Sequence, residues 1–375
     1  MKTIILSQLK KGYSAYVRGL SKRATNQQMK KQVVYLLSFP NNDHGLIDAL
    51  HDSFDLTVCF TKNMSEAAKE YQEKGMKVIN IDTLSGLVET VKVVTASQII
   101  IADNYFAFLG DIKKRPTQHF VQLWHATGAI KQFGLEDKKA QERPQEDQER
   151  FKRVYQSFDY YVVASKAMGE VFKNSYGATE DQMLYLGFPR TDYLLEETKK
   201  DPGLKEKTQL LYLPTYREEE RRDYWQDMKV LLDVLGDEYE VSLKLHPHES
   251  LEEVIRHDSI HLIESTESSD ELMLEADCLI TDYSSVAFDY ALLNPLGKLI
   301  FYWYDEENYK KETGIQVGFK DTMPSSVCHT IQEVANEIKA VDDHLESFNQ
   351  TWNTYNDGQS TARLIQWVKE EMGES

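Results

Sequence analysis

Four short segments combine the side chains and backbone groups that bind phosphate. They span residues 124–131 (WHATGAIK), 187–192 (GFPRTD), 244–248 (KLHPH) and 281–289 (TDYSSVAFD). Each follows or ends an apolar, β-prone run and supplies imidazole, guanidinium, ammonium or hydroxyl groups, or the backbone N–H groups of a helix start. Because these segments occur in both halves of the chain, we predict a cleft between two α/β domains that binds a nucleotide diphosphate.

His125 is the candidate for chemistry in the first segment. The following residues Thr127, Gly128 and Ala129 permit close approach of the backbone to a ligand, and Lys131 adds a positive charge. A histidine after a strand is often structural, but a polar cluster at a loop tip is typical of binding or catalysis. We therefore predict a functional His125, with Gly128 and Lys131 in contact with substrate.

The third segment places His246 between Lys244 and Pro247, with His248 beyond it. Two histidines at this spacing are able to bind a metal, but no Asp-x-Asp or His-Glu-x-x-His pattern accompanies them. A histidine that donates to a phosphate oxygen is the better interpretation, so we expect no metal and no cofactor. The sequence also lacks a P-loop, a hydrolase nucleophile elbow and an NAD glycine fingerprint.

Ser284 and Ser285 precede a predicted helix. Serine is a common N-cap residue, and this structural role is compatible with anion binding, because the helix start adds backbone N–H groups to the two hydroxyls. Asp289, one turn into the helix, is predicted to bind a hydroxyl of a sugar or of glycerol, with a solvated helix residue as the alternative.

Apolar, β-prone runs divide the chain into two α/β halves. In the first half they alternate with helical stretches as in a doubly wound parallel sheet. A polar stretch at 196–207 is the best boundary before a second Rossmann-like domain. We predict domains at 1–195 and 196–375, the second including the C-terminal helices, facing across a cleft in the glycosyltransferase-B architecture. The predicted strands lie at 33–38, 56–60, 77–81, 97–102, 120–124 and 160–164, then at 210–214, 240–245, 260–263, 278–281 and 298–302.

The candidate residues share one position relative to these strands. His125, His246, Ser284 and the tetrapeptide at 214–217 (PTYR) each lie at or just after the end of a predicted strand. Ligands of parallel α/β sheets bind beyond the carboxyl ends of the strands. We therefore expect these groups to meet in one crevice.

Residues 136–150 are charged and nearly lack large apolar side chains. Such a composition predicts a mobile, solvated loop or a frayed helix. The segment follows His125 closely, so a lid is one interpretation; a plain surface insertion is the favoured one.

The chain is acidic overall and basic at its N-terminus. Its 375 residues carry a net charge of -18, which argues against a general nucleic-acid binder. Residues 1–31 contain eight Lys or Arg and no acid, so the remainder carries -26. Apolar residues recur there at roughly helical spacing, which predicts either an amphipathic helix on an anionic membrane or a helix packed on its own domain. The membrane interpretation uses Lys10, Lys11, Lys22 and Arg23.

The remaining composition indicates the compartment. No apolar run is long enough to span a membrane, and the N-terminus lacks the features of a signal peptide. Cys59, Cys278 and Cys328 are far apart and odd in number, which disfavours disulfides and a cysteine metal site. We expect a cytosolic protein.

Together with residues 214–217, the four segments resemble the CDP-glycerol glycerophosphotransferase family of wall teichoic acid synthesis, over about residues 30–370. The resemblance implies the glycosyltransferase-B fold and transfer of glycerol phosphate from CDP-glycerol to a lipid-linked acceptor at the inner membrane face. The functional histidines of the family fall on His125 and His246. The predicted substrate-binding set is Gly128, Lys131, Arg190, Thr215, Tyr216, Arg217, Lys244, Ser284, Ser285 and Asp289.

The sequence after His125 resembles the primase branch of this family. Many polymerases have His-Gly-Thr-Pro there, whereas this chain has His-Ala-Thr-Gly-Ala-Ile-Lys and is short. Primases attach the first glycerol phosphate to an undecaprenyl-diphosphate disaccharide of N-acetylmannosamine and N-acetylglucosamine. Polymerase activity, ribitol phosphate transfer and a nucleotide-sugar glycosyltransferase remain alternatives, and a membrane-recruited CDP-glycerol-binding protein is the non-enzyme alternative.

The resemblance also implies a reaction scheme. An acceptor hydroxyl attacks the β-phosphate of CDP-glycerol and CMP leaves. His125 is expected to be the general base, because imidazole titrates near working pH. His246, Arg190, Lys244 and the helix start at Ser284 are expected to neutralise the diphosphate. The expected site of action is the cytoplasmic face of the membrane, with the protein bound peripherally.

Overall fold

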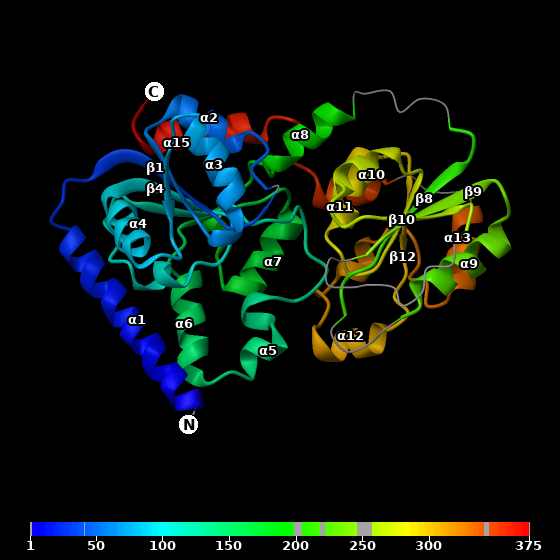
Figure 1. The fold of residues 1–375 in the computed structure, drawn as a ribbon, viewed down its shortest axis with the longest axis horizontal. Coiled ribbons are helices and arrows are strands. Elements are labelled where there is room, and N and C mark those ends of the chain that lie inside the picture. The colour runs from blue at the N-terminus through cyan, green and yellow to red at the C-terminus, as the bar shows by residue number, and fades with distance from the viewer. Residues whose placement is uncertain are drawn as a thin grey trace.

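The computed structural model describes residues 2–40, 42–198, 205–217, 222–245, 257–340 and 345–374. It contains two parallel sheets, each flanked by helices, which form two domains side by side (Figure 1). The first sheet has the order β3-β2-β1-β4-β5-β6-β7, and the second has the order β10-β9-β8-β11-β12. The strands are β1 (Lys30–Leu37), β2 (Leu56–Phe60), β3 (Lys77–Asn80), β4 (Ser97–Ala102), β5 (His119–Gln122), β6 (Tyr160–Val162), β7 (Met183–Leu184), β8 (Thr208–Leu213), β9 (Tyr239–Lys244), β10 (Ile260–Ile263), β11 (Cys278–Thr281) and β12 (Lys298–Phe301).

The central strands are buried on both faces, which explains their continuous apolar sequences. All five residues of β2 are buried, and so are the last six of β1. In both sheets the strand order reverses beside the first strand, between β1 and β4 and between β8 and β11. Such switch points open a crevice at the carboxyl ends of the strands, which is where ligands of doubly wound sheets bind.

Helices cover both sheets, and the last of them returns to the first domain. The helix α15 contacts α2 and α8, and its residues Leu364 and Val368, together with Met372 directly after it, join the core of the first sheet. The expectation that the C-terminal helices all complete the second domain is therefore wrong for α15. The α-helices are α1 (Lys2–Ala24), α2 (Leu46–Ser53), α3 (Ser65–Glu73), α4 (Leu84–Ala96), α5 (Lys138–Gln141), α6 (Gln145–Tyr155), α7 (Lys166–Tyr176), α8 (Arg190–Glu197), α9 (Tyr224–Leu235), α10 (Ser269–Glu275), α11 (Val286–Leu293), α12 (Glu306–Glu312), α13 (Ile331–Lys339), α14 (Glu346–Trp352) and α15 (Ser360–Glu371). In the described parts of the chain, five 3-10 turns accompany them: η1 (Lys62–Met64), η2 (Ala107–Asp111), η3 (Gly134–Glu136), η4 (Glu180–Gln182) and η5 (Phe319–Thr322).

The two domains pair through their backbones. Lys131 of the first domain and Ile315 of the second form an antiparallel bridge. The backbone N–H of Gln132 donates to Gly314 O at 3.1 Å, and that of Gln316 donates to Ile130 O at 2.7 Å. The chain immediately after His125 is therefore held directly against the second domain.

The charged segment at 136–150 is not a loop. It ends η3, forms α5 and begins α6, which packs against η2 and buries Val154 completely. Its acidic residues pair with α1: Lys10 Nζ lies 2.6 Å from Asp147 Oδ2, and Lys11 Nζ lies 2.6 Å from Glu146 Oε1. The helix forms because a neighbouring helix supplies the partners for its charges.

The predicted N-terminal helix is confirmed as α1, and its inner face packs on its own domain. Ser14, Val17, Ser21 and Ala24 are buried, at the three- and four-residue spacing of one helix face. Lys11, Lys22 and Arg23 are exposed. Packing occupies one face of the helix and leaves these cations in solvent.

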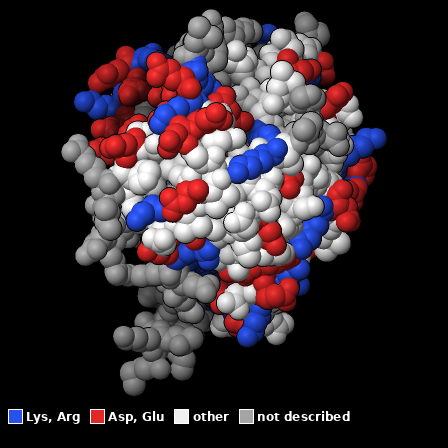
Figure 2. Space-filling view, turned by 90° about the vertical axis from the view of Figure 1, so that its right-hand side faces the viewer, with Lys and Arg blue, Asp and Glu red and all other residues white. Residues whose placement is uncertain are grey.

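The face of the second domain that points away from the first carries mixed charge. Figure 2 shows blue and red side chains interspersed around uncharged areas, without a continuous basic face. Among the described helices, none combines the length and the apolar character that a membrane crossing requires.

Candidate active site

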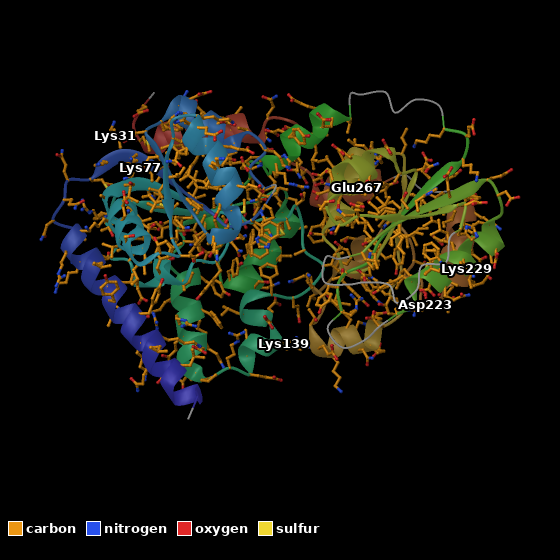
Figure 3. The ribbon with its side chains drawn as sticks, viewed as in Figure 1. Lys31, Lys77, Lys139, Asp223, Lys229 and Glu267 are labelled. Atoms are coloured by element: carbon orange, nitrogen blue, oxygen red, sulfur yellow. The ribbon has the colours of Figure 1, made fainter. Side chains whose placement is uncertain are left out.

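A cavity of about 670 Å³ lies between the two domains. Lys131, predicted from sequence, lines it from the first domain, and Thr215, Tyr216 and Arg217 line it from the second. Lys139 on α5 also lines it and lies opposite α12 (Figure 3). Its cationic lining residues are Lys131, Lys138, Lys139, Arg217 and Lys311, and its acidic ones are Glu142, Asp305 and Glu312. This excess of cations suits an anionic ligand.

The loop that carries His125 has an unusual backbone. Trp124 directly before it has a φ of 70°, a left-handed conformation that costs energy in a residue other than glycine. Asn42 Nδ2 donates to Trp124 O at 2.8 Å, and the Trp124 N–H donates to Gln122 Oε1 at 2.8 Å. The indole stacks on Phe133 with ring centroids 4.6 Å apart. These contacts stabilise the strained backbone of Trp124, which determines the orientation of His125.

One hydrogen bond defines the tautomer of His125. Its Nδ1 lies 3.2 Å from the backbone oxygen of Asp103. A carbonyl oxygen only accepts, so Nδ1 carries the proton and Nε2 keeps its lone pair. Burial, with a smaller effect from Lys131, lowers the pKa of His125 to about 4 against the opposing hydrogen bond to Asp103. The imidazole is therefore neutral at pH 7 and able to accept a proton at Nε2.

Asp103 makes two sets of contacts near His125. Its backbone carbonyl accepts from His125, and its carboxylate accepts from the chain that follows β1. The carboxylate accepts from the backbone N–H groups of Ser38 at 2.7 Å and Phe39 at 2.9 Å, and from Ser38 Oγ at 2.9 Å. The ring of Phe39 stacks on His125 at 4.2 Å. Burial raises the pKa of Asp103 to about 6, against the hydrogen bonds that stabilise its charge. Sequence reasoning missed this residue, although it directly follows β4 at the switch point.

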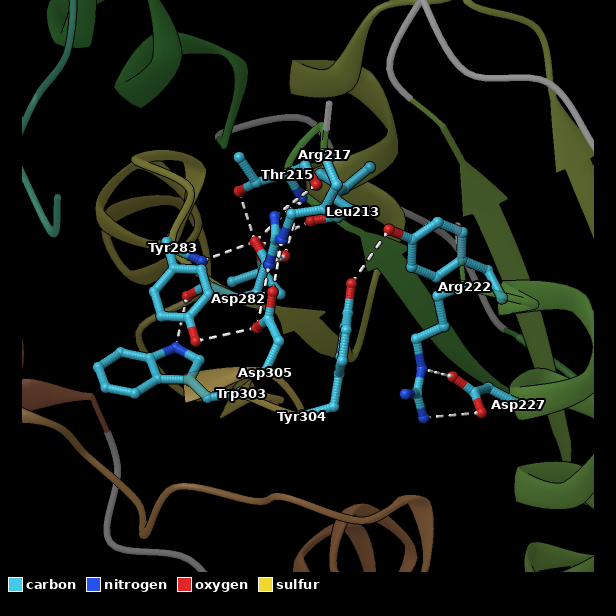
Figure 4. A network of polar contacts seen from close by, with 12 residues as sticks. Leu213, Thr215, Arg217, Arg222, Asp227, Asp282, Tyr283, Trp303, Tyr304 and Asp305 are labelled. Carbon is cyan, nitrogen blue, oxygen red and sulfur yellow. Dashed lines mark hydrogen bonds and ion pairs between the residues drawn. The ribbon is translucent and has the colours of Figure 1, made fainter. Parts of the chain in front are cut away.

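Asp282 plays the same part in the second domain (Figure 4). It directly follows β11 and accepts from the Thr215 N–H at 2.9 and 3.0 Å and from Thr215 Oγ1. Each domain therefore uses an aspartate after its fourth strand to hold the chain that leaves its first strand. In the first domain this chain carries Phe39, and in the second it carries Thr215 and Arg217.

Arg217 is held inside the protein by two carboxylates (Figure 4). Its Nε lies 2.7 Å from Asp305 Oδ2, and its Nη2 lies 2.9 Å from Asp282 Oδ2. The guanidinium also lies 4.9 Å from the centre of the Tyr309 ring. Burial opposes its charge, but Asp282 and Asp305 raise the pKa of Arg217 further. Its expected contact with substrate stays a prediction, whereas its role in holding the loop at 213–217 is visible in the structure.

Arg190 and Asp289 bind each other across the domain interface. Arg190 Nη1 lies 2.8 Å from Asp289 Oδ2, and Arg190 Nη2 lies 2.7 Å from Asp270 Oδ1. Thr127 Oγ1 also donates to Asp289. His44, whose ring stacks on Tyr193, lies 3.8 Å from Asp270. The predicted roles of Arg190 on phosphate and Asp289 on a hydroxyl stay predictions, and both require exchange of these partners for ligand.

The helix predicted to begin after Ser284 and Ser285 is present as α11. Ser285 is the N-cap of α11 but makes no side-chain capping bond, and Ser284 Oγ lies 3.5 Å from the Val286 N–H.

Lys244 Nζ donates to Glu267 O and Ser269 Oγ, and burial lowers the pKa of Lys244. His246 and His248 lie outside the described residues. Within the described ranges, no group of three or more His, Cys, Asp or Glu is arranged to hold a metal.

Gly128 serves the packing of the two domains. A Cβ at this position would come within 2.7 Å of the Phe288 ring on α11. Phe288 is fully buried and stacks on Phe348, so it has no room to retreat. The absent side chain is needed for contact between the domains, and the predicted ligand contact of Gly128 stays untested.

We expect Gly128→Ala to lower the free energy of unfolding by about 1–3 kcal/mol, as overpacking of a tight contact does. Gly19→Ala is the matched control, because an added Cβ there meets no atom within 4 Å and alanine favours a helix. Denaturant unfolding of both variants tests this. Phe288→Leu should restore part of the loss in Gly128→Ala, and equal stability of the two glycine variants would contradict the packing argument.

Comparisons with known proteins identify the family of the chain. A family model described as CDP-Glycerol:Poly(glycerophosphate) glycerophosphotransferase matches residues 20–370. The chain is 34% identical over 369 residues to a teichoic acid glycerol-phosphate primase of Staphylococcus aureus, covering 96% of this chain and 97% of the relative. It is 30% identical over 352 residues to the Bacillus subtilis protein of the same description, covering 91% and 92%.

A solved structure of the wall teichoic acid polymerase TagF superposes with a TM-score of 0.70 at 20% identity. The match covers 100% of this chain and 96% of that chain. With the two switched parallel sheets, this likeness confirms the predicted glycosyltransferase-B fold.

Proposed function

Because the chain belongs to the CDP-glycerol:poly(glycerophosphate) glycerophosphotransferase family, a family of teichoic acid enzymes, we propose that it acts as a primase. It transfers glycerol phosphate from CDP-glycerol to a hydroxyl of an undecaprenyl-diphosphate-linked disaccharide and releases CMP. Relatives described as glycerol-phosphate primases match over more than nine-tenths of both chains, which supports the primase assignment over a polymerase.

The observation that carries this proposal is a neutral histidine beside a cation-rich cavity between domains. Lys131 connects the two features, since it lines the cavity and also lies close enough to His125 to lower its pKa. Desolvation lowers the pKa of Lys131 itself, and the attraction of Asp282 opposes this effect. A diphosphate near Lys131 would place its β-phosphorus within reach of the loop that carries the base.

The proposed chemistry is one displacement at phosphorus. The acceptor oxygen forms a bond to the β-phosphorus, His125 Nε2 takes the hydroxyl proton, and the bond from that phosphorus to the bridging oxygen breaks to release CMP. Lys131 and the N-terminus of α11 at Ser284 and Ser285 stabilise the charge on the equatorial oxygens. His246 and Lys244 are proposed to hold the diphosphate from the second domain.

We also propose that the protein binds peripherally to the cytoplasmic face of the membrane, because a lipid-linked acceptor is confined to that surface. Three of the four cations predicted for this contact, Lys11, Lys22 and Arg23, are exposed on α1. Lys10 and Lys11 are paired with α6 and contribute less free charge than the sequence suggested.

The direct test is the mass of the product formed from CDP-glycerol and a synthetic lipid-linked disaccharide. The proposal predicts addition of a single glycerol phosphate with one CMP released per acceptor. Long chains would indicate a polymerase, and turnover of UDP-sugars with UDP release would indicate a glycosyltransferase. Binding of CDP-glycerol without any turnover would support the binding-protein alternative.

The helix start at α11 provides a test of the donor site. The double variant Ser284→Ala, Ser285→Ala removes two hydroxyls beside the helix N-terminus, and we expect the Kd for CDP-glycerol to rise by about 10- to 100-fold, as lost hydrogen bonds to a charged group do. Ser65→Ala, at the start of α3 in the first domain, is the control and should bind like the parent. Unchanged calorimetric affinity of the double variant would place the diphosphate elsewhere.

A further inference from the structure

Three strand ends of the first sheet meet around Asp103. The strands β1, β4 and β5 are adjacent; Phe39 lies just after β1, Asp103 directly after β4 and His125 just after β5. Asp103 is fully buried between the other two strand ends. A residue at this place is able to fix the candidate base His125 relative to the rest of the first domain.

The backbone of Asp103 contacts one edge of the imidazole. Its carbonyl oxygen lies 3.2 Å from Nδ1 of His125. Because the two ring nitrogens point in different directions, this contact directs Nε2 away from Asp103. It leaves the plane of the ring free to turn about the line between the two atoms, so a second contact has to fix the plane.

Phe39 supplies that second contact. Its ring stacks on the imidazole with the centroids 4.2 Å apart and the planes 18° apart. Phe39 is 37% exposed and is absent from the apolar cores formed by the described residues. Its position therefore depends on how its backbone is held.

The carboxylate of Asp103 holds this backbone. It accepts from the N–H of Phe39 at 2.9 Å, from the N–H of Ser38 at 2.7 Å and from the hydroxyl of Ser38 at 2.9 Å. Three hydrogen bonds to one buried carboxylate fix the chain that leaves β1. The side chain of Asp103 thus acts on the face of the His125 ring through Phe39.

We propose that Asp103 is a positioning residue for the base His125. Its carbonyl sets the edge of the imidazole, and its carboxylate sets the plane through Phe39. This inference rests on the proposed function, in which Nε2 takes the proton of the acceptor hydroxyl. A general base is effective only while its lone pair points at that proton, so a small rotation of the ring lowers the rate.

The environment of His125 distinguishes this role from stabilisation of charge on the imidazolium. Burial is the main cause that lowers the pKa of His125; the hydrogen bond to the Asp103 carbonyl opposes it, and Lys131 adds to it. The carboxylate of Asp103 is not among these causes. The pKa of His125 therefore reports how well the ring is covered, and Phe39 is part of that cover.

Four single variants of the full chain test the role. Asp103→Ala removes the three acceptor contacts. Asp103→Asn is the conservative change, because its amide oxygen can accept from both N–H groups and its NH₂ can donate to Ser38 Oγ. Phe39→Ala removes the ring and keeps the carboxylate. Asp159→Ala is the matched control, since it deletes a carboxylate that accepts the Phe120 N–H at 2.8 Å, at the opposite end of β5. Thermal unfolding verifies that each variant is folded.

Nitrogen-15 NMR titration of the His125 side chain is the direct readout. The parent should titrate with a pKa of about 4. Asp103→Ala and Phe39→Ala should both raise this pKa toward 6.5, because each uncovers the ring, whereas Asp103→Asn and Asp159→Ala should leave it at the parental value. The titration needs no turnover, so it distinguishes failure of the positioning role from failure of the proposed function.

Turnover gives the second readout. Asp103→Ala should lower kcat by about 10- to 100-fold with an unchanged Kd for CDP-glycerol, and Asp103→Asn should restore most of the loss. Combining Asp103→Ala with Phe39→Ala should lower kcat no further than the worse single variant, because both act through one ring. An unchanged His125 pKa in Asp103→Ala, an equal loss in Asp103→Asn, or losses that multiply in the double variant would overturn the role.

Discussion

Replacement of His125 by alanine is expected to lower turnover of CDP-glycerol and acceptor by about 10²–10⁴-fold, the usual contribution of a positioned general base. The Kd for CDP-glycerol should change little, because His125 accepts a proton from the acceptor and is not proposed to hold the donor. A loss confined to kcat identifies a group that acts in the transition state. Near-parental turnover would remove His125 from the mechanism.

His44→Ala is a suitable control for the His125 variant. His44 is also a histidine of the first domain, but its ring stacks on Tyr193 and faces Asp270. We expect a much smaller effect on kcat from His44→Ala. Equal losses in both variants would point to disturbed packing between the domains and would argue against base catalysis.

The pH dependence follows from the environment of His125. Burial lowers its pKa from 6.5 to about 4 in the folded protein. The acidic limb of kcat/KM should therefore lie below pH 6.5. Between pH 6.5 and 4 the unfolded chain binds a proton that the folded chain does not, so this residue makes the fold progressively less stable as the pH falls through that window. His125→Asn should weaken this acid sensitivity in denaturant unfolding.

Replacement of Arg217 by methionine is expected to lower the free energy of unfolding by about 3–5 kcal/mol. Asp282 and Asp305 are 0% and 4% exposed in their side chains, and the change leaves both carboxylates buried without their cation. Urea unfolding measures the loss. Donor affinity should fall as well, because the loop at 213–217 lines the inter-domain cavity.

Arg222→Met is the matched control for this prediction. Arg222 also pairs with an aspartate, Asp227, and lies over the ring of Tyr304, but its side chain is 29% exposed. We expect a loss of about 1 kcal/mol or less, since water screens a more exposed pair. Adding Asp305→Asn to Arg217→Met should recover stability, because one of the two orphaned charges is removed. If Arg217→Met is no worse than Arg222→Met, the two carboxylates do not depend on Arg217.

The sequence alone was sufficient for the fold class and for the position of most candidate residues. A strand that is buried on both faces is apolar throughout. Buried parallel strands can therefore be recognised in a sequence as continuous apolar runs, as at 33–37 and 278–281. Polar residues directly after such runs lie at the carboxyl edge of the sheet. His125, Thr215 and Ser284 were found by this rule.

The tertiary structure alone decided the partners of the charged residues. Arg190 is predicted to meet phosphate and Arg217 to contact substrate, yet their partners Asp289 and Asp305 lie 99 and 88 positions away along the chain. No local pattern identifies such a pair, because the distance between its members depends on how two sheets pack. Asp103 and Asp282 were missed for a related reason: their hydrogen bonds join strands that become neighbours only when the strand order reverses.

Two helices illustrate the same limit. The few apolar residues of the segment at 136–150 predict a solvated loop or a frayed helix, whereas α1 supplies the counter-charges that stabilise it as helix. The helix α15 was assigned to the wrong domain, because an amphipathic pattern indicates that one face is buried but not against which sheet. The hydrophobic periodicity of a helix can be read from a few consecutive residues. An ion pair or a packed helix face involves two segments that only folding brings together, so it cannot be read from either segment alone.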